Sequence, residues 1–208
     1  LEVSLDTTAK GKRDTEAKLT VAETAQAELA GKTSAEATRR KATEAVQAKL
    51  KQTGTGSVAI TGDAVHLHIP SLVLFKPNDD VLTDRGKAAL TKVAAALKDL
   101  PEWQAWVQGH TDDQPVLVPK APPAPPSPPV KKGAKPVPPP PAPVVRFPTN
   151  WELSAARALA VVHFFQDVAK LDPARLAALA FSQYAPASKK DKAANRRLEI
   201  VVARRPAA

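Results

Sequence analysis

A proline-rich stretch between Pro115 and Pro148 constrains the fold of this chain more than any other feature. Fifteen of the 21 prolines in the 208-residue sequence fall within it. Proline lacks a backbone N–H and disfavours helix in the residue before it, so a regular helix or strand cannot form there. A mobile, polyproline-like insert is expected instead. The folded part must therefore be assembled from the segments on either side.

The N-terminal segment has the opposite character. Residues 1–52 contain no proline and are rich in alanine, lysine, glutamate, threonine and glutamine. Most of these are strong helix formers, which predicts a long helix ending near Gln52. Large apolar residues are few and give no sustained heptad. We interpret residues 1–52 as a helical stalk or spacer, with a weak coiled coil to a second copy or another partner as the alternative. Residues 53–57, Thr-Gly-Thr-Gly-Ser, are a linker by composition.

The remaining segments predict alternating strands and helices. Their order is β-α-β-α-β-β, which is typical of an α/β (α+β sandwich) fold with a small mixed sheet and both helices packed on one face. The whole chain then adds an N-terminal helical extension. The pattern predicts the following elements: a hairpin over 58–60 and 65–69, a helix from Thr83 or Asp84 to Asp99, a strand over 103–109, a helix from Thr149 or Asn150 to about Ala169, a short turn or helix over 172–179, a loop or strand over 180–184, a charged loop over 189–195 and a strand over 196–203.

Composition narrows the possible partners. The formal net charge of +9 favours contact with something anionic, such as nucleic acid, a membrane surface or an acidic wall polymer. No aromatic residues interleave with the basic ones, which disfavours nucleic acid. The absence of cysteine excludes disulfides and cysteine metal sites. There is no run of 18 apolar residues and no signal-peptide pattern, so the protein is either cytoplasmic or has a signal or anchor upstream.

Two motifs flank the proline-rich stretch. Gly109-His-Thr-Asp112 ends a predicted strand and enters a turn, and Asn150-Trp-Glu-Leu-Ser-Ala-Ala-Arg157 begins a predicted helix. They place an acidic and a basic side chain at neighbouring element ends. This arrangement suits recognition of a small zwitterionic ligand.

Together with Asn195-Arg-Arg-Leu-Glu-Ile200, these motifs resemble the OmpA-like peptidoglycan-binding domain. The segment Phe147–Arg157 is most similar to the MotB branch of that family, the stator proteins of bacterial motors. The resemblance covers about residues 58–204, interrupted by the insert at 115–148, and leaves 205–208 as a tail. It does not extend to the N-terminal helix or to the insert, which separates Asp112 from Asn150 more widely than the family's loops do.

The resemblance implies noncovalent binding of the peptide stem of peptidoglycan, chiefly its diaminopimelate residue. The two implied ligand anchors are Asp112, which can accept hydrogen bonds from an ammonium, and Arg157, which can grip a carboxylate with two N–H groups. The implied supporting residues are Thr111, Asn150, Leu153, Ser154 and Arg197. For both Arg196 and Arg197, pairing with acids across the sheet is the alternative.

The expected protein is a noncatalytic cell-wall anchor without a cofactor. It would lie in the periplasm, bound to the wall and tethered to the outer membrane through an upstream membrane or lipid anchor. The alternatives are a stator subunit of a flagellar or gliding motor, a peptidoglycan-cleaving enzyme and a nucleic-acid binder. Nothing indicates an acid opposite a nucleophile, which disfavours the enzyme. His66 and His68 share a strand face, but no third ligand follows at a recognisable spacing, so no metal site is expected.

Overall fold

The computed structural model of the chain describes residues 2–116 and 146–205, and the side chains from residue 18 onward. It divides into two compact units, residues 1–46 and 47–208. Most of the predicted proline-rich insert lies outside the described residues. The same holds for most of the predicted tail.

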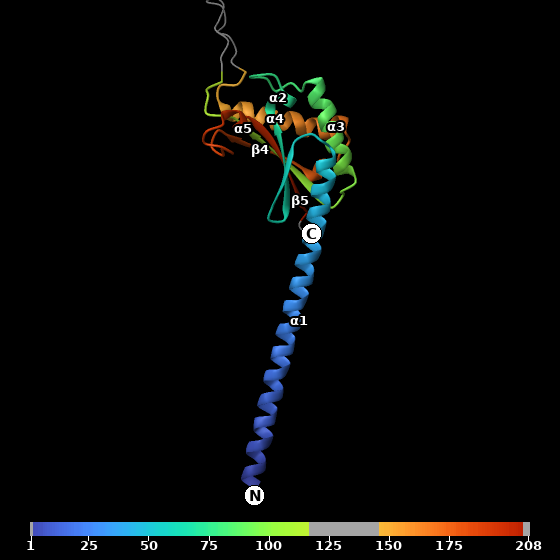
Figure 1. Ribbon diagram of the computed structural model, residues 1–208, viewed down its shortest axis with the longest axis vertical. Coiled ribbons are helices and arrows are strands. Elements are labelled where there is room, and N and C mark those ends of the chain that lie inside the picture. Colours follow the sequence, from blue (N-terminus) through green and yellow to red (C-terminus); the bar gives the residue numbers. More distant parts are fainter. Residues whose placement is uncertain (1, 117–145, 206–208) are drawn as a thin grey trace, which may run out of the picture. The chain divides into compact units, whose positions relative to one another are not determined.

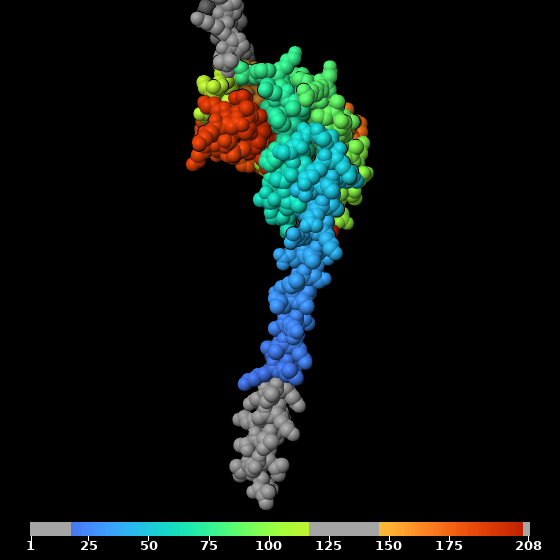
Figure 2. Space-filling model, in the orientation of Figure 1, coloured from blue at the N-terminus to red at the C-terminus, as the bar shows by residue number. Residues whose placement is uncertain are grey.

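The N-terminal segment forms one continuous helix, α1 (Glu2–Gln52), as predicted. Every side chain from Lys18 to Lys41 is exposed to solvent (Figure 2). The apolar residues Leu19 and Leu29 are among them. Intrinsic helix propensity, without an apolar face that packs on other described residues, therefore accounts for this part of the helix. The interpretations as stalk and as coiled-coil partner both stay predictions.

The second unit contains the predicted mixed sheet. Its strands are β1 (Ser57–Thr61), β2 (Ala64–Pro70), β3 (Trp103–His110), β4 (Leu176–Ser182) and β5 (Arg197–Arg204). They lie in the order β1-β2-β5-β3-β4 (Figure 1). Only β3 and β4 run parallel, and the other neighbouring pairs are antiparallel. The predicted fold class is confirmed.

The hydrophobic core lies on one face of this sheet. Leu67, Ile200 and Val107 are paired side by side on β2, β5 and β3, and all three are completely buried. The helices α3 (Asp84–Lys98) and α4 (Asn150–His163) supply the other half of the core. Because side chains alternate between faces, His66 and Glu199 lie on the opposite face. That face carries the polar cluster described below.

Threonine caps fix where both long helices begin. The hydroxyl of Thr83 accepts from the Gly86 N–H at 3.0 Å. The hydroxyl of Thr149 accepts from the Trp151 N–H at 3.1 Å, and the Glu152 carboxylate accepts from the Thr149 N–H at 2.9 Å, which completes a capping box. The start of α4 is thereby defined within one residue.

Three short segments depart from the sequence prediction. The prediction of a turn or helix over 172–179 is wrong for most of its length, because only Pro173–Arg175 forms a 3-10 turn and Leu176 begins β4. Alanine and leucine favour helix, but parallel pairing with β3 overrides that preference here. The apolar run Leu72-Val-Leu-Phe75, for which the sequence pattern predicted no helix, lies mostly in a short helix, α2 (Ser71–Leu74), and the predicted charged loop contains α5 (Lys192–Asn195).

Candidate functional site

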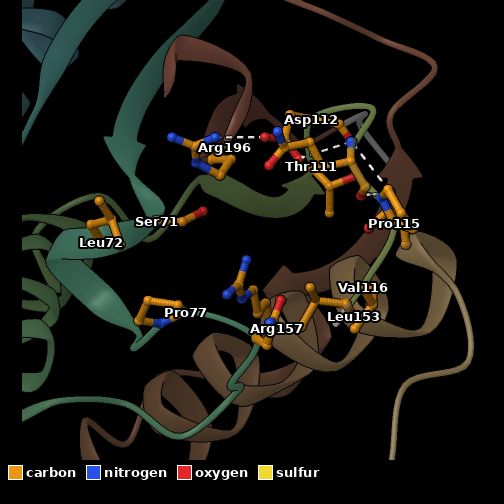
Figure 3. A pocket seen from close by; sticks show the side chains of 13 residues that line it. Ser71, Leu72, Pro77, Thr111, Asp112, Pro115, Val116, Leu153, Arg157 and Arg196 are labelled. Carbon is orange, nitrogen blue, oxygen red and sulfur yellow. Dashed lines mark hydrogen bonds and ion pairs between the residues drawn. The ribbon is translucent and has the colours of Figure 1, made fainter. Parts of the chain in front are cut away.

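A cavity of about 600 Å³ opens where the end of β3 meets the start of α4 (Figure 3). This volume lies in the range of small-ligand sites. The walls come from α2, the loop before α3, the turn after β3, α4 and the residue before β5. The lining residues are Ser71, Leu72, Pro77, Asn78, Thr111, Asp112, Gln114, Pro115, Val116, Asn150, Leu153, Arg157 and Arg196.

Asp112 supplies the acidic group of the cavity. Its side chain is 8% exposed, and its Oδ2 is 2.5 Å from a terminal nitrogen of Arg196. Its Oδ1 accepts from the Gln114 N–H at 3.3 Å. A carboxylate this far from water requires such partners. The turn after β3 therefore presents a carboxylate that already has one cationic neighbour.

Arg157 supplies the opposing basic group from the second turn of α4. Its Nε donates to the main-chain carbonyl of Asp79 at 2.9 Å, and a terminal nitrogen donates to that of Lys76 at 3.3 Å. The guanidinium also lies over the ring of Phe75, 5.3 Å from the ring centre. Burial lowers the pKa of Arg157, while the carboxylates of Asp79 and Asp80 raise it. The guanidinium remains charged at any ordinary pH.

The charged groups face the cavity from different sides. Figure 3 shows the Arg157 guanidinium pointing into the cavity, with the Asp112–Arg196 pair on the far side. The negative charge of Asp112 is close enough to Arg157 to raise the pKa of the guanidinium. Among the described lining residues the two arginines outnumber the single carboxylate. The cavity therefore offers one acceptor for an ammonium and two donors for carboxylates.

Two buried hydroxyls add unused hydrogen-bonding capacity. Within the described part of the chain, Ser71 Oγ and Thr111 Oγ1 are buried without a hydrogen-bond partner. Both residues line the cavity. An unsatisfied buried polar group costs free energy, so a ligand that pairs with these hydroxyls would recover it.

Asn150 and Ser154 hold the walls of the cavity together. The Asn150 side-chain amide donates to the carbonyls of Gln114 at 2.9 Å and Asp112 at 3.2 Å, which fastens the turn to the start of α4. Ser154 is completely buried. Its hydroxyl accepts from the Ser182 N–H at 3.2 Å and so ties α4 to β4.

The structure brings five of the seven residues predicted from sequence to the cavity wall, namely Thr111, Asp112, Asn150, Leu153 and Arg157. Ser154 lies behind the wall. Arg197 lies elsewhere, because its guanidinium donates to Glu199 at 3.3 Å and to the Ala185 carbonyl. The neighbouring Arg196 takes the place at the cavity. Strand alternation in the sequence already distinguishes the two arginines, because it places Arg197 on the same face of the sheet as Glu199.

A second polar cluster surrounds Glu199 on the open face of the sheet. His66 Nδ1 lies 2.5 Å and His68 Nδ1 3.4 Å from its carboxylate oxygens, and His110 Nε2 lies 3.8 Å away. Burial raises the pKa of Glu199, but the hydrogen bond from His66 and the charges of His68 and Arg197 outweigh it, so the pKa is lowered. Among the described residues, no group of three or more His, Cys, Asp or Glu side chains could hold a metal ion.

His110 makes the stability of the fold depend on pH. Burial lowers its pKa from 6.5 to about 4. The unfolded chain therefore binds a proton below pH 6.5 that the folded chain takes up only near pH 4, so stability is full above pH 6.5 and falls between these values. We expect the free energy of unfolding to drop by about 2 kcal/mol from pH 7 to pH 5. Urea titrations at both pH values measure this drop.

The control for this prediction is His110→Phe. It keeps an aromatic ring against Phe181, whose ring centre lies 5.0 Å from that of His110, and removes the titrating group. The variant should lose clearly less stability between pH 7 and pH 5. A loss equal to that of the unmodified chain would assign the effect to other groups.

The sequence profile of the OmpA family matches residues 74–199, which include α3, β3, α4, β4 and all described cavity-lining residues except Ser71 and Leu72. The chain belongs to the OmpA family. An uncharacterized Bacillus subtilis protein, YtxE, is 27% identical over 142 residues, which are 66% of this chain and 48% of that protein. The chain thus spans about half the length of this curated relative.

Solved structures with the same fold include MotB-like domains. A putative MotB-like protein from Desulfovibrio vulgaris is 23% identical with a TM-score of 0.61, over 83% of this chain and 94% of that one. The cell wall anchor of the T6SS from Pseudomonas aeruginosa is 24% identical with a TM-score of 0.56, over 78% and 97%. The periplasmic domain of Helicobacter pylori MotB is 21% identical with a TM-score of 0.55, over 72% and 79%. At these identities the similarity shows a common fold.

Proposed function

We propose that this chain binds peptidoglycan noncovalently by seating the diaminopimelate residue of the stem peptide in the cavity. The observation that carries the proposal is the placement of Asp112 and Arg157 around one cavity of about 600 Å³. The free end of diaminopimelate bears an ammonium and a carboxylate. Asp112 accepts from the ammonium, and the unoccupied N–H groups of Arg157 donate to the carboxylate. The hydroxyls of Ser71 and Thr111 supply further polar contacts.

The cellular role that we propose is that of a noncatalytic anchor in the periplasm. The OmpA family membership and the fold shared with a T6SS cell wall anchor support it. Residues 1–52 would act as a stalk toward a membrane or lipid anchor, for which the outer membrane is our proposal. Among the described lining residues Asp112 is the one carboxylate, and it is paired with Arg196, which disfavours acid-base chemistry in the cavity.

A motor stator subunit is the second candidate. The fold shared with the periplasmic domain of MotB favours it. No described helix combines the length and the apolar character needed to cross a membrane. A membrane-spanning helix with an acidic residue in the segment encoded before residue 1 would decide for the stator, and a lipid-attachment signal would decide for the anchor.

Competition with soluble peptides tests the proposed ligand. The chain is co-sedimented with diaminopimelate-containing sacculi in the presence of a stem tripeptide ending in diaminopimelate or in lysine. We expect the first peptide to release the protein and the second to have little effect, because lysine lacks the side-chain carboxylate that Arg157 would bind. Equal competition by both peptides, or failure of the chain to sediment with sacculi, would refute the proposal.

Asp112→Ala provides the matched test of the acidic group. We expect sacculus affinity to fall by about tenfold or more, the equivalent of one lost charge-assisted hydrogen bond. Asp113→Ala is the control, because Asp113 is exposed and pairs with Lys192 at 2.9 Å, outside the cavity. Co-sedimentation at several protein concentrations gives both affinities. Similar losses in the two variants would point to general charge rather than to the cavity.

A further inference from the structure

Two exposed aromatic side chains form a pair near the start of α4, where Asn150 lines the cavity. Trp151, in the first turn of α4, is 47% exposed, and Tyr184, just after β4, is 69% exposed. Their ring centres lie 5.6 Å apart with the ring planes tilted by 30°. Trp103, by contrast, is buried in the core. Contact of apolar ring surface with water is unfavourable in free energy, and exposed apolar patches often mark binding sites.

The pair is connected to the cavity wall through the residues that precede each ring in the chain. Asn150 lines the cavity, and its side-chain amide donates to Gln183 Oε1 at 3.1 Å. Trp151 and Tyr184 are the next residues along the chain after each of these partners. One hydrogen bond at the edge of the cavity thus links the two segments that carry the rings.

Hydrogen bonds hold the main chain of both residues in place. The Trp151 N–H donates to the Thr149 hydroxyl at 3.1 Å, and the Trp151 carbonyl accepts from the Ser154 hydroxyl at 3.0 Å. The Tyr184 N–H donates to the Phe181 carbonyl at 3.1 Å. A ligand that binds the rings therefore pays little to order the main chain beneath them.

We propose that the Trp151–Tyr184 pair binds an amino-sugar ring of the glycan strand. The proposal rests on the proposed function, since a stem peptide in the cavity is covalently attached to such a sugar a few residues away. The C–H-bearing face of a sugar packs on an aromatic face, while the Tyr184 hydroxyl and the Trp151 indole N–H can pair with hydroxyl and acetamido groups. The cavity would then select the peptide, and the aromatic pair would add affinity for the attached sugar.

Isothermal titration with three ligands tests this inference. The ligands are the free stem tripeptide, the same tripeptide on its disaccharide, and glycan strands stripped of peptide. For the unmodified chain we expect the disaccharide-tripeptide to bind about tenfold more tightly than the tripeptide. Trp151→Ala and Tyr184→Ala should each remove most of that advantage and leave tripeptide affinity unchanged. Tyr184→Phe, which keeps the ring, should retain most of it.

The outcomes separate the two proposals. Equal affinity of the unmodified chain for the first two ligands, or a parallel loss for both ligands in the alanine variants, overturns the glycan inference. Absence of tripeptide binding overturns the proposed function instead. In that case binding of stripped glycan that depends on Tyr184 would still support the aromatic pair as a sugar site, and its absence would reject that site too. Thermal unfolding of each variant confirms that it is folded.

Discussion

Arg157→Lys is expected to lower the affinity for diaminopimelate-containing sacculi by about 100-fold while the domain stays folded. Lysine keeps the positive charge and most of the aliphatic stem. It cannot, however, donate at once to the carbonyls of Asp79 and Lys76 and to a ligand carboxylate with the planar geometry of a guanidinium. Arg157→Ala should lose as much affinity and also some stability, because those two carbonyls lose their donor.

Arg146→Lys is the matched control for this prediction. Arg146 pairs with Asp79 at 3.3 Å and Asp80 at 2.5 Å, but its side chain is 61% exposed and it does not line the cavity. The same substitution there should change sacculus affinity by less than about twofold, as is usual for exposed ion pairs. Co-sedimentation measures the affinity of each variant, and a urea unfolding curve shows that it is folded. If Arg157→Lys keeps its affinity, Arg157 does not bind a ligand carboxylate.

Gly109→Ala is expected to destabilise the second unit by about 3 kcal/mol or more. A Cβ at position 109 would lie 2.1 Å from the Ser154 carbonyl oxygen and 2.8 Å from its carbon. These are backbone atoms of α4, so relief requires the helix to move away from β3. Because α4 also carries Asn150 and Arg157, the cavity would be distorted together with the core. Urea unfolding of the full chain measures the loss.

Gly31→Ala is the control for that substitution. Apart from its chain neighbours and the backbone of α1 itself, no described atom lies within 4 Å of a Cβ built at Gly31. Alanine is the better helix former by about 1 kcal/mol, so this variant should keep or increase helicity. A Gly109→Ala variant as stable as the unmodified chain would mean that α4 and β3 do not approach as closely as described.

The elements with a clear period were predictable. Alternation around Gly62 gave the hairpin, and the three-to-four spacing with a threonine in front gave α3 and α4. β4 was not, because the sequence Leu-Ala-Ala-Leu is compatible with either period and only its pairing with β3 decides between them. The helix preference of these few residues is weaker than the hydrogen bonding that joins β4 to β3 at the edge of the sheet.

The positions of Asp112 and Arg157 in the candidate site were predictable, and the rest of its wall was less so. Asp112 and Arg157 belong to recognisable motifs, and the fold brings both to one cavity. The contributions of Ser71 and Arg196 depend on how α2 and the start of β5 meet in space. No local pattern encodes that meeting. The register of β5 directs the side chain of Arg197 to Glu199, away from the cavity wall.

The ion pair between Asp112 and Arg196 has a consequence for how firmly a ligand would be held. An incoming ammonium does not meet a bare carboxylate, so it must share or replace an existing partner. Binding of the ammonium therefore replaces one ion pair of Asp112 by another. The net free energy of binding is smaller than the strength of the new ion pair alone. Release is correspondingly easy. If the proposed function holds, each copy of the protein can dissociate from the wall and bind again as the wall is remodelled. Many copies together would still keep the envelope attached to the wall.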